Sequence, residues 1–247
     1  LGTVIGGTTA SLPNIISGNG SDCIYIASGD NNTVIQGNYI GTDVTGAADL
    51  GNALNGVYVL SSSNTITNNV VSGNNTNGIW LDDGNANDNI ITGNIVGLNA
   101  AGAAALANTQ SGMVIEGSRN SIGGTTATVR NIISGNTNNG ILLTGIYSTS
   151  NTIQSNYIGT NITGLIRRNN SQNGIAITSG ASSNTIGGTS ATMRNLISGN
   201  SGDGVRITGV SSRGNTIQGN YIGVNVNGNT ALSNDGDGIE IEGSTTV

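Results

Sequence analysis

The chain has 247 residues with 7 cationic and 13 acidic side chains, a net charge of −6 and no histidine, and every cation is an arginine. The lack of histidine and lysine excludes Ser-His-Asp and Cys-His catalysis, histidine metal sites, Schiff bases and Walker lysines. The acidic balance argues against nucleic-acid binding, and no apolar run approaches the ~18 residues of a membrane-spanning helix.

One pattern of asparagine, isoleucine and glycine repeats along the chain in eight half-units. They begin near residues 1, 33, 64, 89, 120, 151, 184 and 215. Longer copies carry insertions at two fixed places, between the first and second segments in odd copies and between the second and third in even copies. Insertions at fixed points of a constant frame predict loops on a repetitive core.

The first two segments of each half-unit have the form Asn-x-Ile and predict two short strands joined at a corner. The second asparagine recurs in all eight copies, followed two residues later by Ile or Val. If the copies stack, its side-chain amides form a hydrogen-bonded ladder along the corner. The recurring asparagines are Asn14, Asn38, Asn69, Asn94, Asn131, Asn156, Asn195 and Asn220.

The third segment has the form Gly-Ile-x-Ile and shows the clearest strand pattern. Its outer positions are apolar in all eight copies, for example in Ile79-Trp80-Leu81, whereas the middle position varies from Trp to Arg to Glu. Period-2 alternation of this kind predicts a strand with one buried face. Three strands per half-unit and no helical periodicity predict an all-β solenoid.

The combined pattern resembles the right-handed parallel β-helix repeat of pectin-lyase-like enzymes, NosD-type periplasmic proteins and large secreted bacterial surface proteins. The resemblance covers the whole chain and implies one β-helix domain over residues 1–247, with about eight coils of three short strands. It also implies a secreted or cell-surface protein. The chain starts and stops inside a repeat, so we expect a piece of a longer chain with neighbouring domains.

Stacked coils would bring Tyr25, Tyr58 and Trp80 into one outward column on the third strand, with about 5 Å between neighbours. Aromatic side chains in a row offer apolar faces and polar tips, which suit sugar rings. We therefore expect these three residues to bind a polysaccharide. A neighbouring domain covering the same patch is the alternative.

Two carboxylates, Asp82 and Glu116, fall in the adjacent outward column beside Trp80, and Asp83 follows in the turn. Neighbouring coils would place the first two near the ~5–5.5 Å spacing of a retaining glycosidase. Glycoside cleavage by paired carboxylates needs neither His nor Lys. Asp82, Glu116 and Asp83 are therefore the candidate catalytic residues, in an order that the sequence leaves open.

Two further functions stay open. A noncatalytic surface or adhesin stalk fits the regularity of the repeat. The resemblance to pectin-lyase-like enzymes also implies a Ca²⁺-dependent polysaccharide lyase, in which Arg206 would be the base. Its oxygen ligands would come from an acidic group of Asp203, Glu240 and Glu242, with Asp235 and Asp237 in the next loop. Apart from this possible Ca²⁺ we expect no cofactor and no resident metal site.

Overall fold

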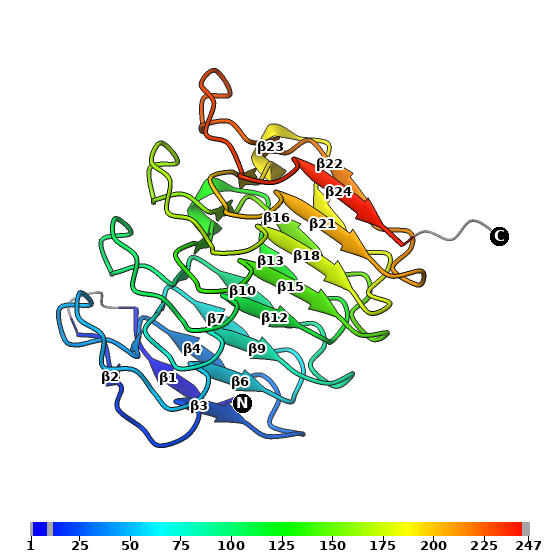
Figure 1. Ribbon diagram of the computed structural model, residues 1–247. Helices are drawn as coiled ribbons and strands as arrows, with labels where there is room; N and C mark the ends of the chain where they lie inside the picture. The colour runs from blue at the N-terminus through cyan, green and yellow to red at the C-terminus, as the bar shows by residue number, and fades with distance from the viewer. Residues whose placement is uncertain (1, 9–11, 244–247) are drawn as a thin grey trace.

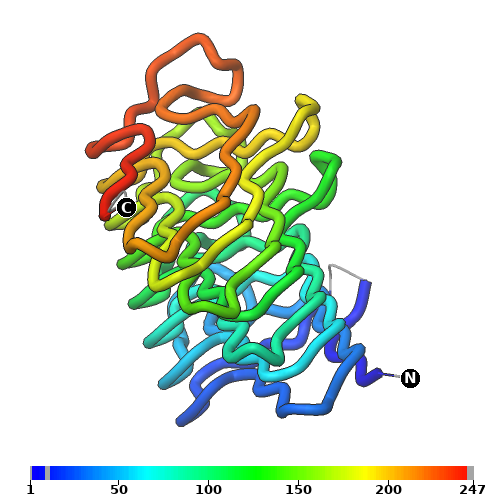
Figure 2. Tube along the Cα trace, turned by 90° about the vertical axis from the view of Figure 1, so that its right-hand side faces the viewer, coloured from blue at the N-terminus to red at the C-terminus, as the bar shows by residue number. Residues whose placement is uncertain are grey.

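The computed structural model describes residues 2–8 and 12–243, whose strands form three parallel sheets of eight strands each. Every sheet takes one strand from each turn of the chain, so the backbone rises by one coil after every three strands (Figure 1). This is the right-handed parallel β-helix of eight coils that the repeat predicts. The two ends of the chain lie at opposite ends of the stack (Figure 2).

The strands are short and keep the chain order in every coil. The first sheet contains β1 (Val4–Gly6), β4 (Val34–Gln36), β7 (Thr65–Thr67), β10 (Ile90–Thr92), β13 (Ser121–Gly123), β16 (Thr152–Gln154), β19 (Thr185–Gly187) and β22 (Thr216–Gln218). The second contains β2 (Ile15–Ile16), β5 (Tyr39–Ile40), β8 (Val70–Val71), β11 (Ile95–Val96), β14 (Ile132–Ile133), β17 (Tyr157–Ile158), β20 (Leu196–Ile197) and β23 (Tyr221–Ile222). The third contains β3 (Ile24–Ile26), β6 (Val57–Val59), β9 (Ile79–Leu81), β12 (Met113–Ile115), β15 (Ile141–Thr144), β18 (Ile175–Thr178), β21 (Val205–Thr208) and β24 (Ile239–Glu242).

The core is a column of aliphatic side chains inside the coils. Alternation along each strand sends one side chain inward, as in Thr65-Ile66-Thr67, where Ile66 is fully buried and both threonines are half-buried. Ile66 pairs with Ile35 and Ile91 on the neighbouring coils, so like side chains stack. Removing this apolar surface from water drives folding, and β-branched side chains suit the pleated surface.

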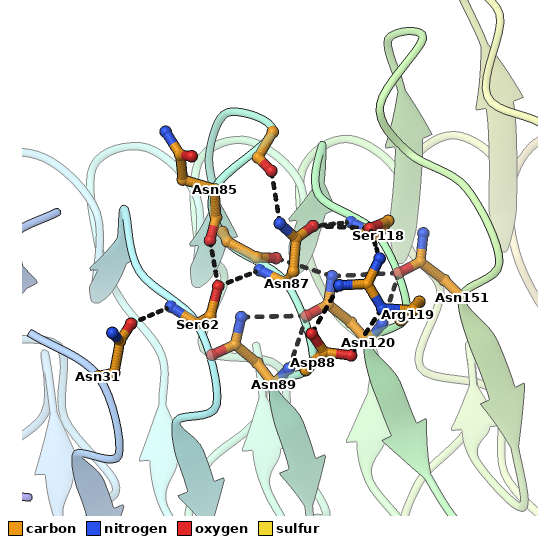
Figure 3. A network of polar contacts seen from close by, with 12 residues as sticks. Asn31, Ser62, Asn85, Asn87, Asp88, Asn89, Ser118, Arg119, Asn120 and Asn151 are labelled. Carbon is orange, nitrogen blue, oxygen red and sulfur yellow. Dashed lines mark hydrogen bonds and ion pairs between the residues drawn. The ribbon is translucent and has the colours of Figure 1, made fainter. Parts of the chain in front are cut away.

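Asparagine ladders join the coils at all three corners. The predicted ladder, between the first and second sheets, is complete from Asn14 to Asn220, with amide-to-amide distances of 2.9–3.2 Å. A second ladder runs from Asn64 to Asn215 between the third and first sheets, and Figure 3 shows its Asn89–Asn120–Asn151 part. A third runs from Asn19 to Asn234 between the second and third sheets.

The insertions lie where the repeat places them. In coils 5 and 7 the loop between the first two strands contains the 3₁₀ helices η1 (Ala127–Val129) and η2 (Ala191–Met193). Even coils carry loops between the second and third strands, which project from one side of the stack (Figure 1) and bond to one another. Gly46 O accepts from Ala100 N at 2.9 Å, for example. No helix in residues 2–8 and 12–243 is long and apolar enough to cross a lipid bilayer.

Candidate functional site

The three aromatic residues lie on adjacent strands of the third sheet. Strand register pairs Tyr25 with Tyr58 and Tyr58 with Trp80. Their ring centroids are 5.6 Å and 5.1 Å apart, with the rings tilted by 36° and 48°. At the spacing of neighbouring strands the rings pack mainly on one another. Tyr25 is 55 % exposed, whereas Tyr58 and Trp80 are half-buried.

The aromatic column ends at the third coil, and the fourth coil carries Val114 in the same position. Val114 pairs with Trp80 on one side and with Leu142 on the other, and only 6 % of its surface is exposed. The smaller valine lies between two larger side chains. The outward position is therefore covered at Val114 and is not open to solvent there.

The carboxylates of Asp82 and Glu116 stand side by side at the ends of β9 and β12. Parallel pairing continues past both strands, because Asp82 N donates to Val59 O at 3.0 Å and Glu116 N donates to Leu81 O at 2.9 Å. The two side chains are half-buried and lie on neighbouring strands, whose spacing is ~4.8 Å. The Tyr58 hydroxyl donates a hydrogen bond to Asp82 Oδ2.

The environment of Glu116 favours its protonated form. Burial, followed by the neighbouring Asp82 carboxyl, raises the pKa of Glu116 to about 7. The backbone N–H of Asp83 and the nearby Trp80 indole oppose this rise. Burial also raises the pKa of Tyr58, and Asp82 raises it further, so the phenol keeps its proton at neutral pH. A carboxylic acid that stays protonated near pH 7 can act as a general acid.

Trp80 has an unsatisfied polar atom in this cluster. Within residues 2–8 and 12–243, its Nε1 is the one buried side-chain nitrogen or oxygen that lacks a hydrogen-bond partner of normal geometry. The indole lies near Glu116, yet the contact does not have hydrogen-bond geometry. Buried donors without partners are rare, and they call for an explanation such as a bound ligand or water.

Asp83 occupies the turn after β9 in a left-handed conformation, with φ of 64°. Its carboxylate accepts hydrogen bonds from Gly84 N at 2.5 Å and Asn85 Nδ2 at 3.3 Å, and its side chain is exposed. The carboxylate therefore folds back onto its own turn, whereas the backbone N–H of Asp83 is the part directed at Glu116.

A polar network holds this turn in place (Figure 3). Asn87 Nδ2 donates to Gly84 O at 2.5 Å, and Asn87 Oδ1 accepts from Ser118 N at 2.6 Å. Arg119 forms an ion pair with Asp88 at 2.7 Å. Because Ser118 and Arg119 follow Glu116 on the next coil, the network ties together the two turns that carry the carboxylates.

Tyr147 is a fourth aromatic residue beside this site, and the repeat pattern does not predict its position. A Cβ placed on Gly84 would lie 3.1 Å from the Tyr147 ring, so this ring packs over Gly84 two coils away. The intervening turn, Glu116 to Asn120, is shorter than the turns on either side, which leaves room for this contact. Tyr147 is 59 % exposed. The difference in turn length was the available sequence signal.

The residues suggested for a lyase form a different arrangement, at the last two coils. Arg206 pairs with Glu242 at 2.6 Å, Glu240 at 3.1 Å and Asp203 at 3.7 Å. These carboxylates raise the pKa of Arg206, so the guanidinium holds its proton more tightly and is a poor base. Its position among the acidic groups also does not fit a Ca²⁺ site there, and the described part of the chain has no group of three His, Cys, Asp or Glu placed to hold a metal.

Comparison with known proteins adds no further assignment: no protein family, curated protein or solved structure matches the chain.

Proposed function

We propose that the protein binds a polysaccharide along the outer face of the third sheet and hydrolyses it with Glu116 and Asp82. The observation that carries the proposal is the cluster itself. A half-buried glutamic acid with a pKa of about 7 lies beside an aspartate, next to the buried and unpaired N–H of Trp80. A polysaccharide substrate places the protein outside the cell or at its surface.

The roles follow from the two environments. Glu116 is the general acid and donates its proton to the glycosidic oxygen as the bond to the anomeric carbon breaks. Asp82 is the nucleophile: its carboxylate forms an ester bond to that carbon, and the leaving group departs with the proton. Glu116 then removes a proton from water, whose oxygen attacks the anomeric carbon, and the bond between that carbon and Asp82 breaks, which releases the Asp82 carboxylate. Neighbouring strands are ~4.8 Å apart, which is close to the ~5–5.5 Å between the two carboxyl groups of a retaining enzyme and supports this assignment.

The aromatic residues position the sugar in this proposal. Tyr25 offers the largest exposed surface of the three and would contact the sugar at one end of the site. The Trp80 ring would pack on the sugar, while its N–H, which is buried beside Glu116, would donate to that carboxyl once it has lost its proton. The Tyr58 hydroxyl already bonds to Asp82 and would hold the nucleophile in place.

The test is reducing-sugar release from a panel of neutral and acidic polysaccharides. Glu116→Gln is expected to lower the rate by about 10²–10⁴, the usual range for loss of a general acid. Glu242→Gln, at the far end of the same sheet, is the matched control and should keep the wild-type rate. Equal rates for wild type and Glu116→Gln on a cleaved polysaccharide would contradict the assignment.

A noncatalytic stalk is the second candidate, and one observation favours it. The hydrogen-bonded ladders pass the carboxylate pair without a break, at Asn89–Asn120 and Asn74–Asn108. A stalk would release no reducing sugar from any polysaccharide in the panel. Retention of the protein on insoluble polysaccharide distinguishes a sugar-binding protein from a spacer that binds no sugar. Trp80→Ala should weaken retention only if the outer face of the third sheet binds sugar.

A further inference from the structure

A cavity of about 120 Å³ lies on the second sheet, away from the carboxylate pair. Three successive coils supply Tyr157, Leu196 and Tyr221 to its lining, and strand register pairs these residues side by side. Arg130 and Arg194 also line it, together with Val226 from the projecting loop of coil 8. The cavity therefore has an apolar and aromatic floor and two cationic side chains.

Each arginine stacks on one tyrosine in the same way. The guanidinium carbon of Arg130 is 3.8 Å from the ring centroid of Tyr157, and that of Arg194 is 3.9 Å from the ring centroid of Tyr221. The Nε atoms donate to backbone oxygens, to Ser155 O at 2.9 Å and to Gly219 O at 3.1 Å. Ring stacking and the Nε bond orient each guanidinium plane.

The Nη groups of both arginines have no hydrogen-bond or ion-pair partner in the part of the chain that the structure describes. By contrast, Arg119, Arg167 and Arg206 each pair with at least one carboxylate. In a chain with a net charge of −6, two half-buried cations therefore face one cavity without an acidic neighbour. An oxyanion would supply the missing charge and acceptors.

We propose that Arg130 and Arg194 bind a carboxylate or sulfate group of an acidic polysaccharide in this cavity. The planar fork of a guanidinium matches the two oxygens of such a group, and a volume of about 120 Å³ suits one charged group rather than a whole sugar chain. The two arginines belong to coils 5 and 7, so their backbones lie roughly 10 Å apart along the axis, and their long side chains both line the same cavity.

Two observations favour a polysaccharide over a nucleic acid. The chain has only seven cations against thirteen acids, and three of those cations are already paired with carboxylates. A phosphate backbone needs many free cations along its length.

The cavity is also separate from the site proposed for hydrolysis, because it lies on the second sheet, whereas Glu116 lies at the end of a strand of the third sheet.

The test is calorimetric titration at low salt with four probes: sodium sulfate, polygalacturonate, the neutral polymer dextran and duplex DNA. Wild type should bind polygalacturonate, bind sulfate more weakly and leave dextran unbound. Arg130→Gln and Arg194→Gln should each weaken polygalacturonate binding at least tenfold. Arg194→Lys keeps the charge but loses the fork, and it should show a smaller loss. Circular dichroism and thermal melting confirm that each variant is folded.

Arg213→Gln is the matched control, because Arg213 is exposed and its Nε donates to the nearby Val210 O at 2.7 Å. It should bind polygalacturonate as wild type does. Equal affinities for wild type, Arg130→Gln and Arg194→Gln would overturn the proposal. Binding of sulfate without polygalacturonate, or tighter binding of duplex DNA than of polygalacturonate, would overturn the polysaccharide assignment.

Discussion

Glu116 shows how a regular repeat can produce an unusual residue without a break in the backbone. Its position is an ordinary one just past the end of a strand, and its neighbours set its chemistry. Burial and the Asp82 carboxyl raise its pKa to about 7, so at neutral pH a substantial fraction keeps its proton. Asp82, by contrast, accepts a hydrogen bond from the Tyr58 hydroxyl, so the two carboxyl groups of the pair differ in their surroundings.

The first prediction concerns stability. The folded-state pKa of Glu116 lies above its ordinary value of 4.5, so folding favours the proton-bound form. The stabilisation is fully present below about pH 4.5 and is lost as pH rises through about 7. We expect Glu116→Gln, which cannot ionise, to gain thermal stability relative to wild type between pH 5 and 8. A difference in Tm that stays constant across this range would contradict the raised pKa.

The second prediction concerns activity on a polysaccharide that the protein cleaves. A general acid must be protonated, so the rate should fall as pH rises above about 7, the pKa of Glu116. The limiting slope is about tenfold per pH unit. Tyr58→Phe removes the hydroxyl bonded to Asp82 and should lower the rate, while the alkaline limb stays governed by Glu116. An alkaline limb that persists in a residually active Glu116→Gln variant would point to another acid.

At the scale of single elements, the corners matter as much as the strands. The strands of the second sheet are only two residues long, so few backbone bonds join neighbouring coils there. Asparagine amides supply the rest. Asn131 accepts from Asn94 Nδ2 at 3.0 Å, and its own amide donates to Asn156 Oδ1 at 2.9 Å and Ile91 O at 2.8 Å.

The third prediction follows from this ladder. Asn131→Ala removes one rung and leaves buried donors and acceptors on both neighbouring coils without partners. Each such group costs ~1–3 kcal/mol, so we expect the free energy of unfolding to fall by about 3 kcal/mol. Asn75→Ala is the control, since its side chain is exposed, and it should change stability by less than ~0.5 kcal/mol. Chemical denaturation measures both; similar losses would show that the ladder adds little.

The projecting loops of the even coils are a second kind of element that depends on close contact. Gly102 has a φ of 62°, and a Cβ there would lie 2.7 Å from Ile162 Cβ on the loop two coils away. Gly145 also has a positive φ, of 86°, but a Cβ there would meet nothing within 4 Å. These two glycines therefore separate backbone strain from crowding.

The fourth prediction uses this pair. Gly145→Ala carries only the strain of the left-handed backbone, about 1 kcal/mol. Gly102→Ala carries the same strain and also pushes two stacked loops apart, so we expect it to be the more destabilising change by a further ~1 kcal/mol or more. Denaturant midpoints of the two variants provide the comparison. A smaller loss for Gly102→Ala would mean that the loops separate at little cost.

Over the whole molecule, each coil contacts mainly the coils directly before and after it. Every strand pairs only with its equivalents one coil away, from β1–β4 to β21–β24. Stability of such an array is close to a sum over coils and their interfaces. The two-coil unit from residue 120 to residue 183 spans 64 residues, the same offset as that between the equivalent positions Arg130 and Arg194.

The fifth prediction is a deletion. Removing residues 120–183 takes out two whole coils and joins equivalent positions, so the chain should still fold with the same circular dichroism per residue. The denaturant m-value should fall by roughly a quarter, because m follows the surface exposed on unfolding. Removing residues 120–167 takes out unequal parts of the three sheets and should abolish cooperative unfolding. Cooperative unfolding of both variants would contradict a fixed register.

The sequence by itself determined the β-helix, its eight coils, the placement of the insertions and the first asparagine ladder. A strictly repeated frame makes equivalent residues neighbours in space, so position along the chain converts directly into position on a sheet. The two further ladders were not predicted. The asparagines from Asn64 to Asn215 recur at the start of each half-unit, where the repeat pattern alone does not indicate that they bond to one another. Those from Asn19 to Asn234 lie among insertions of varying length, which hides their repetition.

Only the tertiary structure decided how the side chains at equivalent positions of adjacent coils pack on one another. Several features of the site depend on side-chain volumes and turn lengths in adjacent coils. They are the tilt of the aromatic rings, the burial of Val114, the raised pKa of Glu116, the turn of the Asp83 carboxylate onto its own backbone, and the contact of Tyr147 with Gly84 across a short turn. The stacking of Arg130 and Arg194 on tyrosines is of the same kind. Periodicity specifies which positions meet, whereas packing and electrostatics between the particular side chains specify what they do there.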